Sequence, residues 1–276
     1  MIDLHTHTTA SDGRSSPGEL VARARDAGVT VLSVTDHDTV AGCDAAAAAC
    51  AVAGIDFVAG IEMTAVREQA DIHILGYFID PSSPRLLGFL AGQRQRRLER
   101  VRRMIARLAE LGIPLDADAI VQRALDSPGV AIGRPWIARA LVSGGYVETS
   151  DEAFSSWLGR GRPAFVPRQG AAPADVIAEI HEAGGLASMA HPGLVGRDEW
   201  IPDLVAAGLD AIEAYHTGHD EAATVHYRAV AQRCNLPVSG GSDYHGDESH
   251  GAVHPGSVSL PQEEYDRLRR SLAINS

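Results

Sequence analysis

The sequence predicts an α/β protein with a parallel, barrel-like sheet. About seven short apolar, β-like runs alternate with helical patterns along the 276 residues, and this alternation is typical of parallel strands joined by helices. Nearly all candidate His and acidic site residues fall directly after one of these runs. Because active sites of such barrels lie at the carboxyl ends of the strands, we expect these side chains to meet at one mouth.

The first strand, residues 2–4, leads directly into His5 and His7. Residues two apart in an extended segment point to the same side, so both imidazoles should face one point. Neutral imidazole suits Zn, Mn, Fe or Ni, and Asp12 in the following loop adds an oxygen ligand. Two histidines with purely structural roles in a loop would also explain this pair. Whether the other strands are followed by further candidate ligands decides between the two interpretations.

The next elements keep the same rhythm. Ser16 and Pro17 mark the start of a helix that ends before Gly28. A strand over 29–34 ends at Asp36, His37 and Asp38, and an Ala-rich helix covers 42–53. A third strand over 55–59 precedes Glu62, and a fourth over 71–77 contains His73.

The alternation of strands and helices stops at residue 82. One long Arg-rich helix is expected over 85–111, followed by shorter helices at 116–125, 134–143 and 150–157. No strand pattern returns until 164–166. We therefore expect residues 82–163 to be an all-helical insertion forming a lid, with 1–81 and 164–276 forming the barrel.

Alternation resumes after the insertion. Helices are expected at 173–183, 202–207, 221–234 and 261–272, and strands at 186–190, 210–214 and 237–240. These strands are followed by His191, by Tyr215 and His216, and by the run from Asp243 to His245.

Composition narrows the possible partners. The net charge of −12 argues against nonspecific duplex DNA binding. All 24 basic residues are arginines, and residues 82–163 hold 13 of them against 8 acids. The chain has no apolar run near the roughly 18 residues of a membrane span and no leader pattern. Its three cysteines sit in apolar helical patterns. We expect a cytoplasmic protein with reduced thiols and no obligate protein partner.

The His and carboxylate set exceeds what one tetrahedral site can use. Two or three divalent ions sharing a carboxylate would use them all. Such clusters hydrolyse phosphate esters by lowering the pKa of a bridging water and by holding the attacking and leaving oxygens.

These residues resemble the PHP (polymerase and histidinol phosphatase) family. The resemblance rests on His5-x-His7, Asp12, residues 35–38, 60–62, His73, 190–192 and 241–245. It implies a distorted (β/α)7 barrel with two to three divalent ions, of Mn, Zn or Fe. By this resemblance one metal takes His5, His7, Glu62 and Asp243, a second shares Glu62 with His73 and His191, and a third takes Asp12, His37 and His245. Asp12 as a hard ligand favours Mn²⁺.

The insertion resembles that of the small PHP phosphoesterases acting on nucleoside 3′,5′-bisphosphates and short RNA. It implies that Arg134 and Arg160, flanked by Gly and Pro, bind substrate phosphates, since Arg is the bidentate phosphate ligand. Salt bridges within the lid are the alternative for both. Trp136 departs from the His expected at its position in close relatives.

The other polar residues have two possible roles. Asp243 is expected to be catalytic as well as a ligand. His216 and His219 either protonate the leaving group and contact substrate or orient ligands, and Asp36 and Asp38 are expected to orient ligands. His181 and His226, inside helices, are expected to be structural. His250 and His254, in a Gly-rich loop, are weaker candidates.

The leading hypothesis is a phosphatase that removes the 3′-phosphate of adenosine 3′,5′-bisphosphate or a related nucleotide, through a hydroxide that bridges the first two metals. Histidinol phosphatase and 5′→3′ exonuclease on short RNA are alternatives with the same chemistry. A noncatalytic metal-binding PHP module is the alternative from another class.

Overall fold

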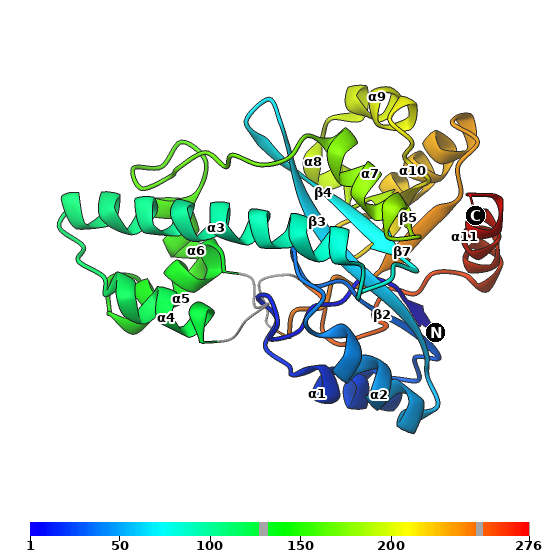
Figure 1. Cartoon of the computed structure of the whole chain (residues 1–276), viewed down its shortest axis with the longest axis horizontal. Coiled ribbons are helices and arrows are strands. Elements are labelled where there is room, and N and C mark those ends of the chain that lie inside the picture. The colour runs from blue at the N-terminus through cyan, green and yellow to red at the C-terminus, as the bar shows by residue number, and fades with distance from the viewer. Residues whose placement is uncertain (127–131, 247–250, 276) are drawn as a thin grey trace.

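Seven strands form one sheet whose spatial order equals their order in the chain (Figure 1). The structure is a computed structural model that describes residues 1–126, 132–246 and 251–275. The strands are β1 (Ile2–Asp3), β2 (Val31–Val34), β3 (Asp56–Arg67), β4 (Ala70–Tyr77), β5 (Leu186–Met189), β6 (Ala211–His216) and β7 (Val238–Gly241). This confirms the predicted barrel-like α/β class.

The ends of the sheet meet. Leu4 N donates to Gly240 O over 3.2 Å, and Thr6 forms an isolated parallel bridge with Tyr244. A Cβ on Gly241 would lie 2.3 Å from the backbone nitrogen of His5. Because only glycine permits this approach, β7 can lie against the segment that carries His5 and nearly close the barrel.

The expectation of an all-parallel sheet was wrong at β4. This strand is antiparallel to both β3 and β5, while the other neighbouring pairs are parallel. Arg67 pairs with Ala70, and the two residues between them, Glu68 and Gln69, have φ of 51° and 62°. Positive φ at both positions is a type I′ hairpin turn, which leaves no room for a crossover helix. Because β3 continues to this turn, Glu62 lies inside a strand rather than after one, whereas His73 lies within β4 as predicted.

Helices cover the outside of the barrel. They are α1 (Pro17–Asp26), α2 (Cys43–Ala53), α7 (Pro173–Glu182), α8 (Pro192–Val195), α9 (Ile201–Ala206), α10 (Glu221–Arg233) and α11 (Gln262–Asn275), with a 3₁₀ turn at Asp198–Trp200. Ser16 caps α1 in a reciprocal capping box with Glu19. No helix in the described ranges has the length and apolar character needed to span a membrane. All three cysteines are free thiols.

The predicted insertion is helical and projects from the barrel (Figure 1). It contains α3 (Pro84–Glu110), α4 (Ala117–Leu125), α5 (Arg134–Ser143), α6 (Ser150–Ala153) and a π-helical turn (Phe154–Leu158). Its buried apolar side chains form a cluster of their own, separate from the barrel core; it includes Leu98, Met104, Leu108, Ile137 and Leu141.

The strand expected at 164–166 was also wrong. This segment is irregular, and side chains of α3 donate hydrogen bonds to its carbonyl oxygens. Arg100 Nε donates to Val166 O over 2.8 Å, and Arg107 donates to Phe165 O. Guanidinium groups therefore replace the neighbouring strand that the apolar pattern suggested.

Buried polar contacts join α3 to the barrel. Arg97 Nε donates to Asp38 Oδ2 over 2.6 Å, and Arg97 Nη2 donates to Thr64 Oγ1 over 3.1 Å. Gln93 Nε2 donates to Thr64 O over 2.9 Å. Since Arg97 and Asp38 are both buried, these contacts fix where α3 passes the mouth of the barrel.

Candidate metal centre

The nine predicted ligand side chains lie together at one mouth of the barrel. His5, His7 and Asp12 follow β1, His37 follows β2, Glu62 and His73 belong to the β3–β4 hairpin, His191 follows β5, and Asp243 and His245 follow β7. The β4 reversal does not disperse them, because His73 lies opposite Thr64 in the antiparallel register, two residues beyond Glu62.

Glu62 is the centre of the cluster. Its Oε1 lies 2.8 Å from His73 Nδ1 and 3.0 Å from His191 Nε2. Its Oε2 lies 2.9 Å from His37 Nδ1 and 3.3 Å from His7 Nε2. Burial alone would raise the pKa of this carboxyl group, but the neighbouring histidines, His37 first among them, hold it well below its usual range. The Glu62 carboxyl group is therefore ionised, and its two oxygens can be shared between two groups of histidines.

Asp243 approaches the same point from β7. Its Oδ1 lies 3.1 Å from His7 Nε2 and 3.3 Å from His5 Nε2. Its backbone has φ of 54° and that of His191 has φ of 28°. Left-handed conformations cost about 1–3 kcal/mol at non-glycine residues and tend to occur at functional sites. Two ligand candidates here are held in this conformation.

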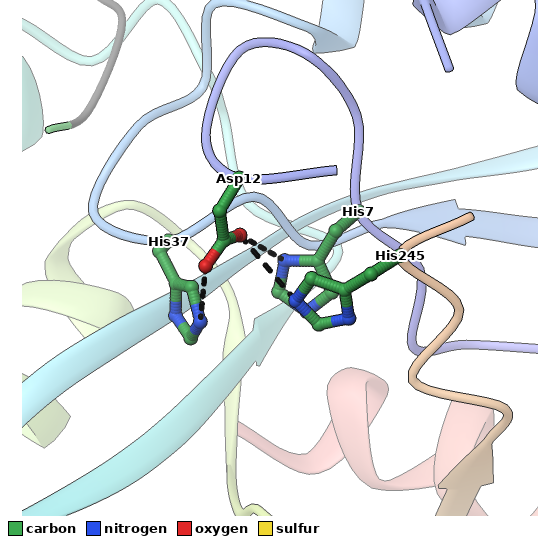
Figure 2. Close-up of side chains that lie close together, drawn as sticks. All are labelled: His7, Asp12, His37 and His245. Carbon is green, nitrogen blue, oxygen red and sulfur yellow. Dashed lines mark ion pairs between the residues drawn. The ribbon is translucent and has the colours of Figure 1, made fainter. Parts of the chain in front are cut away.

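A third group surrounds Asp12. Figure 2 shows its carboxylate between His37 on one side and His7 and His245 on the other. Its Oδ1 lies 3.3 Å from His245 Nε2, and its Oδ2 lies 3.7 Å from His37 Nε2. A Cβ on Gly13 would lie 2.6 Å from the carbonyl of His7, so a glycine after Asp12 lets the loop fold back against His7.

The donor set fits divalent metal ions. Several of its buried atoms, among them His5 Nε2, His7 Nε2, His37 Nδ1, Asp12 Oδ1 and Glu62 Oε2, make no hydrogen bond to the described part of the protein. Within each of several sets, the ring nitrogens and carboxylate oxygens lie within 4.8 Å of one another; the sets are His7–Asp12–His37–His245, His5–His7–Glu62, His37–Glu62–His73 and His5–His216–Asp243. Buried polar atoms without partners are costly unless something else binds them. Mixed imidazole and carboxylate ligands suit Mn, Fe or Zn.

Glu213 was missed by the sequence interpretation. Its Oε1 lies 2.9 Å from His5 Nδ1, and its Oε2 accepts from the backbone nitrogen of His191 over 2.7 Å. The contact orients the His5 ring so that Nε2 faces Glu62 and Asp243. The signal was present, because a carboxylate inside an apolar strand requires a buried partner.

We expect Glu213→Gln to weaken metal binding by about 10- to 100-fold, the usual cost of losing a partner of a ligating histidine. The amide keeps the volume of the side chain but loses the charge that holds His5 Nδ1. Metal content after dialysis against graded metal buffers would measure this. Glu199→Gln is the matched control, since Glu199 pairs with Arg197 on the surface. Equal affinities for all three proteins would contradict the role.

The structure places His216 and His219 where they can orient other groups. His216 Nδ1 accepts from Gly218 N over 2.9 Å, which directs its Nε2 toward Asp243 Oδ2 at 3.3 Å. His219 Nε2 accepts from Gly193 N over 3.1 Å, and its Nδ1 donates to Ala214 O over 3.0 Å. With both nitrogens of His219 engaged, the geometry favours orientation over substrate contact.

The remaining predicted polar residues have clear contacts. Asp36 accepts from Thr8 N at 2.7 Å and from Ser11 Oγ at 2.6 Å, which orders the loop leading to Asp12. Asp38 instead pairs with Arg97 of α3 and with Arg168. His181 pairs with Asp210, His226 with Asp198 and His254 with the carbonyl of Pro255. His250 lies outside the described residues.

A cavity of about 240 Å³ opens beside His37 and His73. Arg97, Arg134 and Arg168 line it, whereas Arg160 is exposed and does not. Arg168 lies 3.5 Å from Asp71 and 3.5 Å from Asp38, and its Nε is buried without a hydrogen bond to the described residues. Burial and the nearby Arg97 lower the pKa of Arg168 to about 9. Such a guanidinium favours a bound anion.

Comparison with known proteins agrees with this geometry. The model of the PHP domain matches residues 3–115. A 3′,5′-nucleoside bisphosphate phosphatase of Chromobacterium violaceum is 38% identical over 249 residues, covering 88% of this chain and 87% of its own. The chain belongs to the PHP family.

Two further relatives define this PHP protein more closely. A 5′-3′ exoribonuclease of Haemophilus influenzae is 37% identical over 250 residues, covering 88% of this chain and 89% of its own. The crystal structure of a Bifidobacterium adolescentis protein assigned as a metal-dependent phosphoesterase superposes with a TM-score of 0.87 at 33% identity, covering 99% of this chain and 96% of the other. The protein is a metal-dependent phosphoesterase.

Proposed function

We propose that this enzyme removes the 3′-phosphate of nucleoside 3′,5′-bisphosphates. The observation that carries the proposal is the arginine-lined cavity directly beside the imidazole–carboxylate cluster. The cavity and the cluster would each bind one of the two phosphate groups of a single substrate. The Chromobacterium relative, named for this activity, supports the assignment.

The charges of the cavity suit a phosphate dianion. Three arginines, Arg97, Arg134 and Arg168, line it together with the carboxylates of Asp12 and Asp71. The positive excess is partly buried, where an anion interacts strongly because solvent screens it little. We infer that these arginines hold the 5′-phosphate while the 3′-phosphate lies at the metal cluster.

The protein's part in the reaction is positioning and charge. Bound divalent ions would polarise the phosphate and lower the pKa of a water molecule. Glu62, Asp12 and Asp243, with their histidines, would hold up to three such ions, with Mn²⁺ favoured by the carboxylate at position 12. The P–O bond to the 3′ oxygen breaks, a water oxygen joins phosphorus, and the 3′ oxygen takes up a proton.

We expect Arg134→Met to raise KM for adenosine 3′,5′-bisphosphate by about 10- to 100-fold, because a charge-assisted contact to the 5′-phosphate is lost. Arg134 is a good position to test, since its nearest carboxylate oxygen is 3.8 Å away and little of the fold depends on it. Steady-state kinetics with Mn²⁺ would measure the change. Hydrolysis of p-nitrophenyl phosphate, which has one phosphate, should be unaffected.

Arg102→Met is the matched control, because Arg102 is exposed on α3 and lines neither this cavity nor the cluster. Equal losses on both substrates would contradict the 5′-phosphate role of Arg134. A panel that includes histidinol phosphate tests the whole assignment. Hydrolysis of histidinol phosphate without hydrolysis of the bisphosphate would overturn it, and no hydrolysis of any ester would favour a noncatalytic module.

A second candidate, 5′→3′ exonuclease activity on short RNA, is favoured by the Arg-rich insertion and by the Haemophilus relative. The same bond to a 3′ oxygen would break, releasing a nucleoside 5′-phosphate and leaving a new 5′-phosphate on the shortened chain. This activity should fall steeply as salt rises, because several phosphates are contacted.

A further inference from the structure

A second cavity lies beside the arginine-lined one. It measures about 860 Å³ and separates the loop before α1 from helices α4, α5 and α6 of the insertion. Ser11 and Trp136 line both cavities. The larger cavity, called the lid groove below, therefore continues from the place where substrate phosphates would bind, past the loop that carries Asp12.

The walls of the lid groove carry nucleic-acid-binding chemistry. Arg14 lines it from the barrel side and Arg139 from α5, and Glu148 is the one acid among the lining residues that the structure describes. Trp136 is half-buried, and the guanidinium of Arg139 lies 5.5 Å from the centre of its ring. In proteins that bind single strands, aromatic rings stack on the bases whatever the base sequence, and arginines contact the backbone phosphates.

Hydroxyl groups complete the lining. Thr9, Ser11, Ser143, Thr149 and Ser150 all contribute to the lid groove. Hydroxyls can donate to phosphate oxygens and exchange hydrogen bonds with ribose 2′-hydroxyls. The surface is thus mixed: beside the apolar side chains of Ala119, Ile120, Ala140 and Val142 it presents an aromatic ring, two cations and several hydroxyl groups.

We propose that the lid groove binds the 3′ continuation of a single-stranded oligoribonucleotide whose 5′ nucleotide lies at the metal cluster. The proposal rests on the proposed phosphoesterase chemistry. The 5′-phosphate occupies the arginine-lined cavity, the first 3′-phosphodiester lies at the cluster, and the next nucleotides pass Trp136 toward Arg139. A nucleoside bisphosphate is then the shortest substrate, which uses the first two places and leaves the lid groove empty.

The kinetic test compares substrates of increasing length. For the wild-type enzyme, kcat/KM should rise from the dinucleotide to the tetranucleotide as the lid groove fills. Arg14→Ala combined with Arg139→Ala should lower kcat/KM for a 5′-phosphorylated pentanucleotide by about tenfold and leave adenosine 3′,5′-bisphosphate unchanged. Arg102→Ala is the control. Equal losses on both substrates, or no length dependence, would overturn the proposal.

A binding measurement separates the lid groove from the chemistry. Fluorescence anisotropy with a 3′-labelled phosphorothioate pentanucleotide should show weaker binding to the double variant. Its log–log salt slope should be shallower by about 1.4, at about 0.7 for each lost phosphate contact. Weaker binding by the double variant, without hydrolysis of any ester by the wild type, would refute the proposed function and support RNA binding in the lid groove. Hydrolysis of the bisphosphate, with identical pentanucleotide binding by both proteins, would support the proposed function and refute RNA binding in the lid groove.

Discussion

Glu62→Gln should lower phosphatase activity by at least about a thousandfold, because metal ions contribute several kcal/mol to such reactions and each 1.36 kcal/mol is a factor of ten. The two oxygens of Glu62 face imidazoles from four separate segments, those carrying His7, His37, His73 and His191. Glutamine keeps the volume, but it has one oxygen in place of two and lacks the charge that two ions would share.

The measurement should combine activity with metal content. Glu62→Gln should lose bound metal, whereas a chelator should inactivate the wild type reversibly, with activity restored by Mn²⁺. Glu199→Gln again controls for a surface carboxylate. A Glu62→Gln protein that retained both its metal and its rate would refute the central position assigned to this residue.

The second large effect is on folding. Asp38→Asn should lower the free energy of unfolding by about 3–5 kcal/mol, the usual result of leaving a buried charge uncompensated. The carboxylate contacts Arg97 at 2.5 Å and Arg168 at 3.5 Å, and its Oδ1 accepts from Thr64 N over 2.7 Å. Asparagine preserves the last contact and removes the charge.

Urea denaturation of the two proteins, with and without metal, would measure the loss. Asp26→Asn provides the comparison, since Asp26 pairs with Arg25 at 2.7 Å in an exposed position and should cost no more than about 1 kcal/mol. If the Asp38 and Asp26 variants lost similar amounts, the ion pairs of Asp38 would not be what holds α3 to the barrel.

The sequence predicted the strand and helix order well because apolar periodicity and helix caps are local. Ser16 with Pro17 marked the start of α1, and the Ala-rich helix predicted over 42–53 corresponds to α2, which ends before Gly54 with φ of 70°. The reversal of β4 was not visible, because its turn uses Glu68 and Gln69 where Asn-Gly or Asp-Gly would signal a type I′ turn.

The same difference, between local patterns and contacts that form only on folding, applies to the site residues. His5 and His7 were recognisable because residues two apart in an extended segment point to the same side. Arg168 was not, because its partners Asp38 and Asp71 are distant in the chain and its surroundings exist only after folding. Arg160 had the Gly-flanked pattern instead, yet it lies exposed. The Gly- and Pro-flanked pattern thus selected Arg134, which lines the cavity, and Arg160, which does not, whereas the burial of Arg168 could be seen only in the folded structure.

The direction of β4 has a consequence for how this molecule can vary. Because β4 returns the chain to the far end of the barrel, α3 must travel past the mouth before it reaches the lid, a distance of about 40 Å for its 27 residues. Inserting one residue between Gln93 and Met104 would turn everything beyond it by about 100°, swinging Trp136 away from the imidazole–carboxylate cluster. Length changes here would have to come in steps of about seven residues, each moving the lid outward by about 10 Å, whereas the connections beyond Glu110 are free of this phase constraint.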